Sequence, residues 1–386
     1  MPAQITLDAD FDNGSLNTTQ SYVSGDQIFL VGRDNFYPNK WKWLYFKALN
    51  TNGACPEFQI SDAFVEGSDR LEKLKMVYSY DQQTWHFFDQ GYLDSTQNTY
   101  HFQNDAPFDH PSVYIAYGIP YPFQRITQWI NRIRSTPWVC PTPSADPNLM
   151  LGWSPGGIDE LKRTIPHHPL YGFQITDPTV VTPKTQVVLM SGVHPNEPLA
   201  NYLLEGLVDF LIGDTPEAQV LRRVADFLVY PMVNPDGRFA GYNRSTVQYL
   251  DRDANRFWRE DLYADMDDIR CIADAIKTDV GLQVDYFIDF HCWSGTERHF
   301  GILSFEEGFH LDPFWRALIQ REPMIGTEDS SFENWSTETF AVKRLNAGFS
   351  MTFENMFIPG ENIDRYHQLG RNMGRAFSDV LSPESP

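Results

Sequence analysis

From about residue 185 onward, short apolar segments alternate with segments of helical periodicity. The expected strands cover residues 187–190, 227–233, 286–290 and 349–353, and the expected helices cover 199–212, 265–278 and 366–381. Strands that alternate with helices along a chain form sheets whose faces are covered by those helices. The alternation therefore predicts an α/β domain with a mixed sheet and helices on both of its faces.

The first third of the chain has a different pattern, in which short segments are divided by turn signals. The stretches "FDNGSLN" and "NTNGAC" supply the Asn-Gly pairs that are typical of hairpins and loops. Segments 41–49 and 113–121 have the composition of strands. Aromatic residues make up 15% of the chain and many of them fall here, which favours half-buried pleated surfaces. The pattern predicts an antiparallel β-sandwich.

The two patterns meet after residue 118. The segment "PFQRITQWINRI" (122–133) is expected to form a short helix, and the proline-rich "STPWVCPTPSADPN" (135–148) is expected to lack regular structure. We therefore expect an amino-terminal β-sandwich domain over residues 1–120 and an α/β domain over residues 121–386.

Charge and composition exclude several classes of partner. The chain has 30 basic and 51 acidic residues, and this net charge of −21 would repel nucleic acids and anionic membranes. It contains no apolar run of the ~18 residues that a membrane span requires. Its first residues have neither the basic nor the apolar region of a secretory signal. Four scattered cysteines without a CxxC pair are expected to be reduced thiols of a cytoplasmic protein: Cys55, Cys140, Cys271 and Cys292.

Three of the expected strands are followed directly by a histidine or an acidic residue. His194 and Glu197 follow the strand at 187–190, His291 follows 286–290, and Glu354 follows 349–353. In sheets of this kind, functional groups gather where the carboxyl ends of strands meet. Any one of these residues alone fits an ordinary loop or surface position. The prediction of a functional site therefore depends on their lying close together in the folded chain.

Together these residues have the chemistry of a catalytic zinc site. Two imidazoles and one carboxylate supply three protein ligands and leave a fourth position for water, so we expect His194, Glu197 and His291 to bind one Zn²⁺ ion. Glu354 has Phe353 and Met356 beside it. A partly apolar setting raises the pKa of a carboxyl group, so Glu354 is expected to act as the general base.

A group of arginines lies downstream of the turn sequence "NPDG" (234–237). Asn255 and Arg256 belong to this region, and a planar guanidinium binds a carboxylate through two parallel hydrogen bonds. The pair is therefore a candidate for binding a terminal carboxylate of a substrate. The alternative is that these arginines pair on the surface with neighbouring acidic residues such as Asp251, Asp253 and Glu260.

Five motifs in this order resemble those of the zinc carboxypeptidase family. They are "HPNE", "NPDG", "DANR", "DFHCWSG" and "MTFENMF", spread over about 160 residues. The chain is most similar to the cytosolic carboxypeptidase, deglutamylase-like branch, whose members carry an amino-terminal β-sandwich. The segments "FDNGSL" and "VYIAYGIPYPFQRITQWI" resemble that branch as well.

The resemblance assigns the same three zinc ligands and the same general base, Glu354, which would activate the zinc-bound water. It further implies that Asp253 supports His194 through a hydrogen bond. Asn255 and Arg256 would bind the carboxyl terminus of a peptide or protein substrate. Arg244, in "GYNRS", would polarise the scissile carbonyl.

Two departures from the family pattern bear on the substrate. No tyrosine lies between Tyr286 and Tyr366, where the family commonly places one that closes over the substrate. Deglutamylating relatives carry a basic residue in a segment where this chain has "STET" and therefore Thr339. Lys343 or Arg344 could replace it, but the sequence does not predict glutamate specificity.

The leading prediction is a zinc metallocarboxypeptidase. A zinc amidohydrolase that deacylates N-acyl amino acids is favoured slightly by the missing tyrosine, although the retained "DANR" argues against it. A binding module with a decayed site is the third possibility, and the five intact motifs argue against that. The sequence specifies neither the preferred terminal residue nor the physiological substrate nor the oligomeric state.

Overall fold

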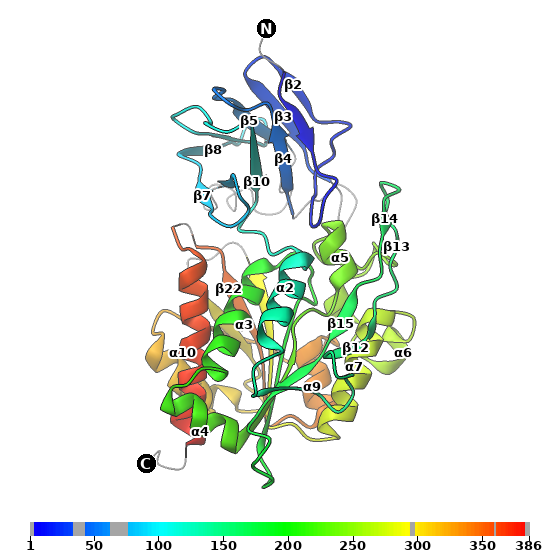
Figure 1. Ribbon diagram of the computed structural model, residues 1–386, viewed down its shortest axis with the longest axis vertical. Coiled ribbons are helices and arrows are strands. Elements are labelled where there is room, and N and C mark those ends of the chain that lie inside the picture. The colour runs from blue at the N-terminus through cyan, green and yellow to red at the C-terminus, as the bar shows by residue number, and fades with distance from the viewer. Residues whose placement is uncertain (1–3, 34–42, 62–75, 294–297, 359, 383–386) are drawn as a thin grey trace.

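The computed structural model describes residues 4–33, 43–61, 76–293, 298–358 and 360–382. Two small sheets form the amino-terminal part of the molecule, at the top of Figure 1, and a larger sheet with its helices forms the rest. In the described part of the chain, no helix is both long enough and apolar enough to cross a bilayer.

The amino-terminal part is a sandwich of two five-stranded sheets. One sheet has the order β1 (Thr6–Asp8), β4 (Tyr45–Leu49), β10 (Ser112–Ala116), β6 (Val77–Ser79) and β7 (His86–Phe87). The other has the order β2 (Tyr22–Ser24), β3 (Gln27–Val31), β5 (Glu57–Ser61), β9 (Thr99–Gln103) and β8 (Gln90–Asp94). Phe46 and Ala48 of β4 share one buried cluster with Phe58 and Ile60 of β5, so alternate residues of both sheets form the core.

The predicted sandwich is confirmed, with three differences of detail. The pair β3–β5 is parallel, whereas the other strand pairs of the two sheets are antiparallel. The strand expected over 41–49 begins at Tyr45, and residues 41 and 42 lie outside the described residues. The strand expected over 113–121 ends at Ala116, because the chain leaves the sheet there to reach the first helix.

An eight-stranded mixed sheet organises the rest of the chain. Its order is β11 (Val139–Pro141), β16 (Phe173–Ile175), β18 (Ala225–Tyr230), β17 (Thr185–Ser191), β19 (Tyr286–Trp293), β22 (Phe349–Met356), β20 (Phe300–Leu303) and β21 (Gly326–Asp329). The four central strands β18, β17, β19 and β22 are parallel. On either side, β16 and β20 run antiparallel to them.

Helices cover both faces of this sheet, as the alternation of strands and helices predicts (Figure 1). Val187 and Leu189 of β17 lie in the buried cluster on one face, while Val188 and Met190 lie in the cluster on the other. The first cluster contains residues of α2 (Phe123–Ile133), α3 (Pro198–Leu211), α4 (Pro216–Val224), α8 (Pro313–Arg321) and α10 (Ile363–Leu381). The second contains residues of α6 (Glu260–Tyr263), α7 (Asp267–Val280) and α9 (Thr337–Leu345).

One local prediction is wrong. The proline-rich segment 135–148 was expected to lack regular structure, yet it supplies the strand β11. Pro141 is the last residue of that strand, and β11 is an edge strand, where a missing N–H is tolerated. The helix expected over 265–278 is confirmed as α7, two residues later at each end, and a separate short helix, α6, precedes it.

The sequence "NPDG" is the start of a helix and not only a turn. The side chain of Asn234 accepts a hydrogen bond from the backbone N–H of Gly237 at 3.0 Å and so caps α5 (Pro235–Ala240). Pro235 occupies the first helical position, where its missing N–H costs nothing. The remaining elements are short: β12 (Met150–Trp153) with β15 (Pro169–Tyr171), β13 (Gly157–Ile158) with β14 (Thr164–Ile165), η1 (Ala254–Arg256) and η2 (Phe309–Leu311). A domain boundary at residues 120–121 stays a prediction.

Candidate metal centre

The carboxyl ends of β17, β19 and β22 meet at one edge of the sheet. The three strands are neighbours and parallel, and His291 is the direct cross-strand partner of Glu354. After β17 the chain turns at Gly192, whose φ is +73°. A side chain there would have its Cβ 2.5 Å from Sδ of Met232, so the turn that leads to His194 requires glycine.

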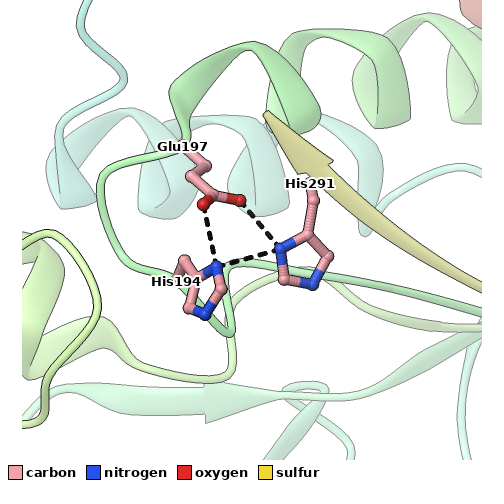
Figure 2. A group of neighbouring side chains, drawn as sticks. All are labelled: His194, Glu197 and His291. Carbon is pink, nitrogen blue, oxygen red and sulfur yellow. Dashed lines mark hydrogen bonds and ion pairs between the residues drawn. The ribbon is translucent and has the colours of Figure 1, made fainter. Parts of the chain in front are cut away.

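His194, Glu197 and His291 point toward a common centre (Figure 2). Nδ1 of His194 lies 2.8 Å from Oε1 of Glu197, and Nδ1 of His291 lies 2.8 Å from Oε2 of the same carboxylate. The two Nδ1 atoms are 3.1 Å apart. Glu197 precedes α3, and its side chain makes no capping bond to that helix. It is therefore available to face the two imidazoles.

Each imidazole presents its other nitrogen to a second carboxylate. Nε2 of His194 lies 2.8 Å from Oδ1 of Asp253, and Nε2 of His291 lies 2.7 Å from Oδ2 of Asp289. This arrangement fixes the tautomer and the orientation of a metal-binding histidine, so that Nδ1 faces the centre. Asp253 lies where the resemblance implied. Asp289 was not predicted, although its position two residues before His291 on a strand places both side chains on the same face.

The electrostatics of the centre favour bound positive charge. Burial opposes ionisation of Glu197, but the neighbouring His194 and His291 hold the pKa of this carboxyl group well below its ordinary value. Burial likewise opposes protonation of His291, but Asp289 and Glu197 raise the pKa of its imidazole well above the ordinary value. The pKa of Asp253 is lowered by His194 and Arg244 against the effect of its burial.

The donor set fits zinc. Ligands held tetrahedrally at about 2.0–2.1 Å from one ion are about 3.3 Å from each other. The ligand atoms of His194, Glu197 and His291 all lie within 4.8 Å of one another, and all three residues are buried. Small shifts would bring these atoms to that spacing.

A pocket of about 370 Å³ opens beside the donor atoms. It is lined by His194, Arg244, Asn255, Arg256, His291, Phe300, Ile302, Glu328, Ser330, Asn334, Glu338, Thr352 and Glu354. Six of the eight residues predicted to form the site are therefore in its wall. The other two contact His194, Glu197 at Nδ1 and Asp253 at Nε2. The sequence did not predict the wall formed by β20, β21 and α9.

Glu354 lies in this wall with one oxygen atom unpaired. The residue is 8% exposed, and among the described residues its Oε2 has no hydrogen-bond partner. Burial raises the pKa of the Glu354 carboxyl group to about 8, and the nearby negative charge of Glu197 contributes. A carboxyl group with a pKa near neutrality is suited to accept and return a proton.

Arg244 reaches the donor centre itself. Its Nη1 lies 3.0 Å from Nε2 of His194 and donates to Oδ2 of Asp253 at 3.3 Å, and its Nη2 lies 3.8 Å from Oε1 of Glu197. Its guanidinium is thus positioned between the predicted ligands and the pocket.

Asn255 and Arg256 lie in the same wall. Oδ1 of Asn255 accepts a hydrogen bond from the backbone N–H of Thr337 at 3.0 Å, so only the amide NH₂ of Asn255, which lies 3.4 Å from Nε2 of His291, can donate to a substrate. Nη1 of Arg256 donates to the backbone oxygen of Asn255 at 2.8 Å. Both residues line the pocket, as the binding of a terminal carboxylate requires.

The residues considered for substrate selection lie elsewhere. Thr339 is fully buried within α9 and does not line the pocket. Lys343 and Arg344 both lie over the ring of Trp335, and Nε of Arg344 donates to Glu260 at 2.9 Å. Neither Lys343 nor Arg344 lines the pocket.

Comparison with known proteins agrees with this geometry. A model of the zinc carboxypeptidase family matches residues 158–274, which include His194, Glu197, Arg244, Asn255 and Arg256. Over these residues the chain is similar to the zinc carboxypeptidase family. His291 and Glu354 lie outside the matched residues, so their assignment depends on the structure.

Proteins similar to this chain include cytosolic carboxypeptidases. The cytosolic carboxypeptidase 6 of Caenorhabditis elegans is 27% identical over 270 residues, which are 66% of this chain and 54% of the relative. That of Mus musculus is 26% identical over 423 residues, covering 97% of this chain and 73% of the relative. The chain thus spans only about half of the length of the first relative.

A solved structure shows the same fold over nearly the whole chain. The metallo-carboxypeptidase of Burkholderia cenocepacia has a TM-score of 0.79 at 22% sequence identity, covering 97% of this chain and 98% of the other. The amino-terminal sandwich and the α/β part are therefore combined in that bacterial protein as they are here.

Proposed function

We propose that this chain is a zinc-dependent metallocarboxypeptidase that removes C-terminal residues from peptides or proteins. One observation carries the proposal. The donor atoms of His194, Glu197 and His291 converge at a pocket that also contains an unpaired buried carboxyl group and two guanidinium groups. A hydrolase for terminal peptide bonds needs all of these components in one place.

The chain's own residues would position the substrate. The guanidinium of Arg256 and the amide NH₂ of Asn255 bind the terminal carboxylate, which places the last peptide bond nearer to Glu354 and Arg244. Arg244 then donates to the oxygen of the scissile carbonyl, where negative charge develops. The Nε2 atoms of the two histidines stay engaged by Asp253 and Asp289, which keeps both Nδ1 atoms directed at the centre.

Zinc bound at this centre would lower the pKa of water and polarise a carbonyl group. Glu354 performs the proton transfers. Its unpaired Oε2 accepts the proton of the attacking water and afterwards donates it to the nitrogen of the leaving residue. A pKa near 8 matches both directions of this transfer, since the group can lose and regain the proton close to neutral pH.

We also propose a cytoplasmic location. The four cysteines are free thiols in the structure, and the relatives named above are called cytosolic. Disulfides are rare in that compartment.

The Glu354→Gln substitution tests the proposed function. The zinc-loaded variant should retain zinc at the stoichiometry of the unaltered chain and lose hydrolysis of a peptide library by at least ~100-fold, because the proton acceptor is gone. Glu333→Gln, on the exposed loop before α9, removes the same charge outside the pocket and should keep full activity.

Three outcomes discriminate between the candidate functions. Zinc-dependent release of C-terminal residues supports a carboxypeptidase. Release of an acyl group from N-acyl amino acids without cleavage of peptides supports the amidohydrolase alternative. Stoichiometric zinc with neither activity would contradict both and leave a binding module.

A further inference from the structure

One acidic residue of the pocket has no role in the chemistry described so far. Glu338 lies in the first turn of α9, is 6% exposed, and lines the pocket beside the metal centre. The first turn of a helix stabilises negative charge. A nearly buried carboxylate in the wall of a substrate pocket is a candidate for recognising the substrate.

The contacts of Glu338 hold its carboxylate in place without neutralising it. Oε2 accepts a hydrogen bond from Oγ1 of Thr352 at 2.9 Å. Oγ1 of Thr337, whose one hydrogen goes to Asp289 at 2.6 Å, lies 3.2 Å from the same oxygen. Thr352 precedes Glu354 by two residues on β22, so the two side chains share a face of the sheet. Glu338 is therefore fixed to the same wall as the proposed general base. A hydroxyl group carries no compensating charge.

The charged residues of the pocket fall into two groups by their proposed role. Of the described residues that line it, the cations Arg244 and Arg256 are assigned to the scissile carbonyl and the terminal carboxylate. Glu338 and Glu328 remain without an assignment. Glu328 lies on the exposed strand β21, at the rim of the pocket. The part of the pocket left for the substrate side chain is thus negative.

Apolar surface accompanies these acids. Phe300 and Ile302 of β20 also line the pocket, on the strand that pairs with β22 on one side and with β21 on the other. Lysine and arginine side chains have an apolar stem that packs on such a surface and a charged head that seeks an acid. A glutamate side chain would instead bring a third negative charge close to Glu328 and Glu338.

We propose that Glu338 is a specificity-determining residue and that the pocket prefers a C-terminal lysine or arginine over glutamate. The stem would lie along Phe300 and Ile302, and the cationic head would reach the Glu338 carboxylate. This inference rests on the proposed carboxypeptidase function, and it gives that function a substrate class.

The test compares substrates that differ only in charge. Peptides ending in arginine, citrulline, lysine and glutamate are offered to the full-length zinc-loaded protein. Citrulline has the shape of arginine without its charge. The value of kcat/KM for arginine should exceed that for citrulline by at least ~10-fold and that for glutamate by more, because a charge pair in a desolvated pocket is worth at least that factor. This comparison requires no variant.

The variants Glu338→Gln and Glu333→Gln then test whether the preference for arginine over citrulline depends on Glu338. Glu338→Gln should reduce the arginine-to-citrulline ratio to within about threefold of unity, because the remaining contacts are the same for both side chains. Glu333→Gln changes the net charge equally but lies outside the pocket wall, so the ratio should stay unchanged. Zinc content and the midpoint of urea unfolding show that both variants are folded.

Binding separates this inference from the proposed function. Calorimetric titration of the zinc-loaded protein with free arginine and free citrulline reports the preference without catalysis. Hydrolysis or binding that favours citrulline or glutamate would overturn the preference and leave the carboxypeptidase intact. Tighter binding of arginine without hydrolysis of any peptide would support the preference and overturn the proposed function.

Discussion

Each imidazole of the metal centre is held between two carboxyl groups. Glu197 faces both Nδ1 atoms, while Asp253 and Asp289 each bind one Nε2 atom. Asp289 is fully buried and also accepts a hydrogen bond from Oγ1 of Thr337 at 2.6 Å. The start of α9 is thereby attached to the ligand His291, so the helix that carries Glu338 and the metal centre share one hydrogen-bond network.

Asp289→Asn should weaken zinc binding by about 10–100-fold. The asparagine keeps the size of the side chain and one acceptor oxygen, but it removes the negative charge that makes His291 a strong ligand. Zinc affinity is measured by competition with a chromophoric chelator. Asp274→Asn, on the exposed side of α7, is the control and should bind zinc as the unaltered chain does. Equal affinities for both variants would show that Asp289 has only a packing role.

Glu354 should make the metal-free protein less stable as the pH rises. Burial raises the pKa of its carboxyl group from 4.5 to about 8 in the folded chain. Between these pH values the unfolded chain releases the proton while the folded chain keeps it, so the free energy of unfolding falls across this window.

The Glu354→Gln variant has no such proton to lose. Relative to the unaltered chain, its free energy of unfolding should therefore increase from pH 5 to pH 8.5. Urea unfolding in the presence of a chelator measures both proteins at each pH. A difference that stays constant with pH would contradict the raised pKa.

The residues of the site were predictable to the extent that each follows a recognisable strand. His194, His291 and Glu354 were found because an apolar run ends just before each of them. Asp289 lies inside such a run, where a buried acid has no pattern that marks it. Glu338 and Glu328 come from elements that the sequence did not reveal, so their places in the pocket required the structure.

At the scale of elements, the long apolar segments were predicted well and the short ones were not. Strands β17, β19 and β22 start within two residues of the expected positions. β20 and β21 have only four residues each, so the sequence pattern that marks a strand cannot be recognised in them. Their pairing with β22 and with each other is set by distant parts of the chain. The part of the pocket wall that these two strands form was therefore the least predictable part of the fold.

Helix α3, which begins directly after Glu197, packs closely on α10. A Cβ at Gly370 of α10 would lie 2.1 Å from the backbone oxygen of Leu203, and a Cβ at Gly206 of α3 would lie 2.2 Å from that of His367. The backbones of the two helices approach each other at these glycines because glycine has no side chain to keep them apart. This contact sets the position of α3 and so of the carboxylate at its start.

Gly370→Ala should destabilise the protein by about 1–3 kcal/mol, because the added methyl group meets backbone atoms that cannot move independently. The better helix propensity of alanine, about 1 kcal/mol, offsets part of this loss.

Gly374→Ala is the comparison variant, in which the added methyl group meets a side chain and not the backbone. Its Cβ would meet a ring carbon of Phe210 at 2.3 Å, and a side chain can rotate away, so the loss should be smaller. Urea unfolding measures both, and a Gly370→Ala protein as stable as the unaltered chain would contradict the tight contact.

At the scale of the whole molecule, the amino-terminal part is hydrogen-bonded directly to the loop that carries His194 and Glu197. Nδ2 of Asn13 donates to Oδ1 of Asn196 at 2.5 Å and to the backbone oxygen of Arg238 at 2.8 Å. Asn196 lies between His194 and Glu197 in the chain. The neighbouring Asp12 accepts hydrogen bonds from the backbone N–H groups of Phe123 and Gln124, at the start of α2. The segment "FDNGSLN", read from sequence as a turn, thus connects the two parts of the molecule.

Asn13→Ala should therefore weaken zinc binding although the residue touches no ligand. Removing its amide leaves Asn196 and the oxygen of Arg238 without a buried donor, at a cost of about 1–3 kcal/mol. Because Asn196 is in the loop that carries two predicted ligands, part of this cost should appear as a loss of zinc affinity of about 10-fold.

Asp12→Ala is the matched control at the adjacent position. It removes the side chain that accepts the first N–H groups of α2, and the loss of such a helix cap costs about 1 kcal/mol of stability. It should lower the urea midpoint and leave zinc affinity unchanged. If both variants lose stability equally and bind zinc equally well, the amino-terminal sandwich supports the fold alone and does not position the metal loop.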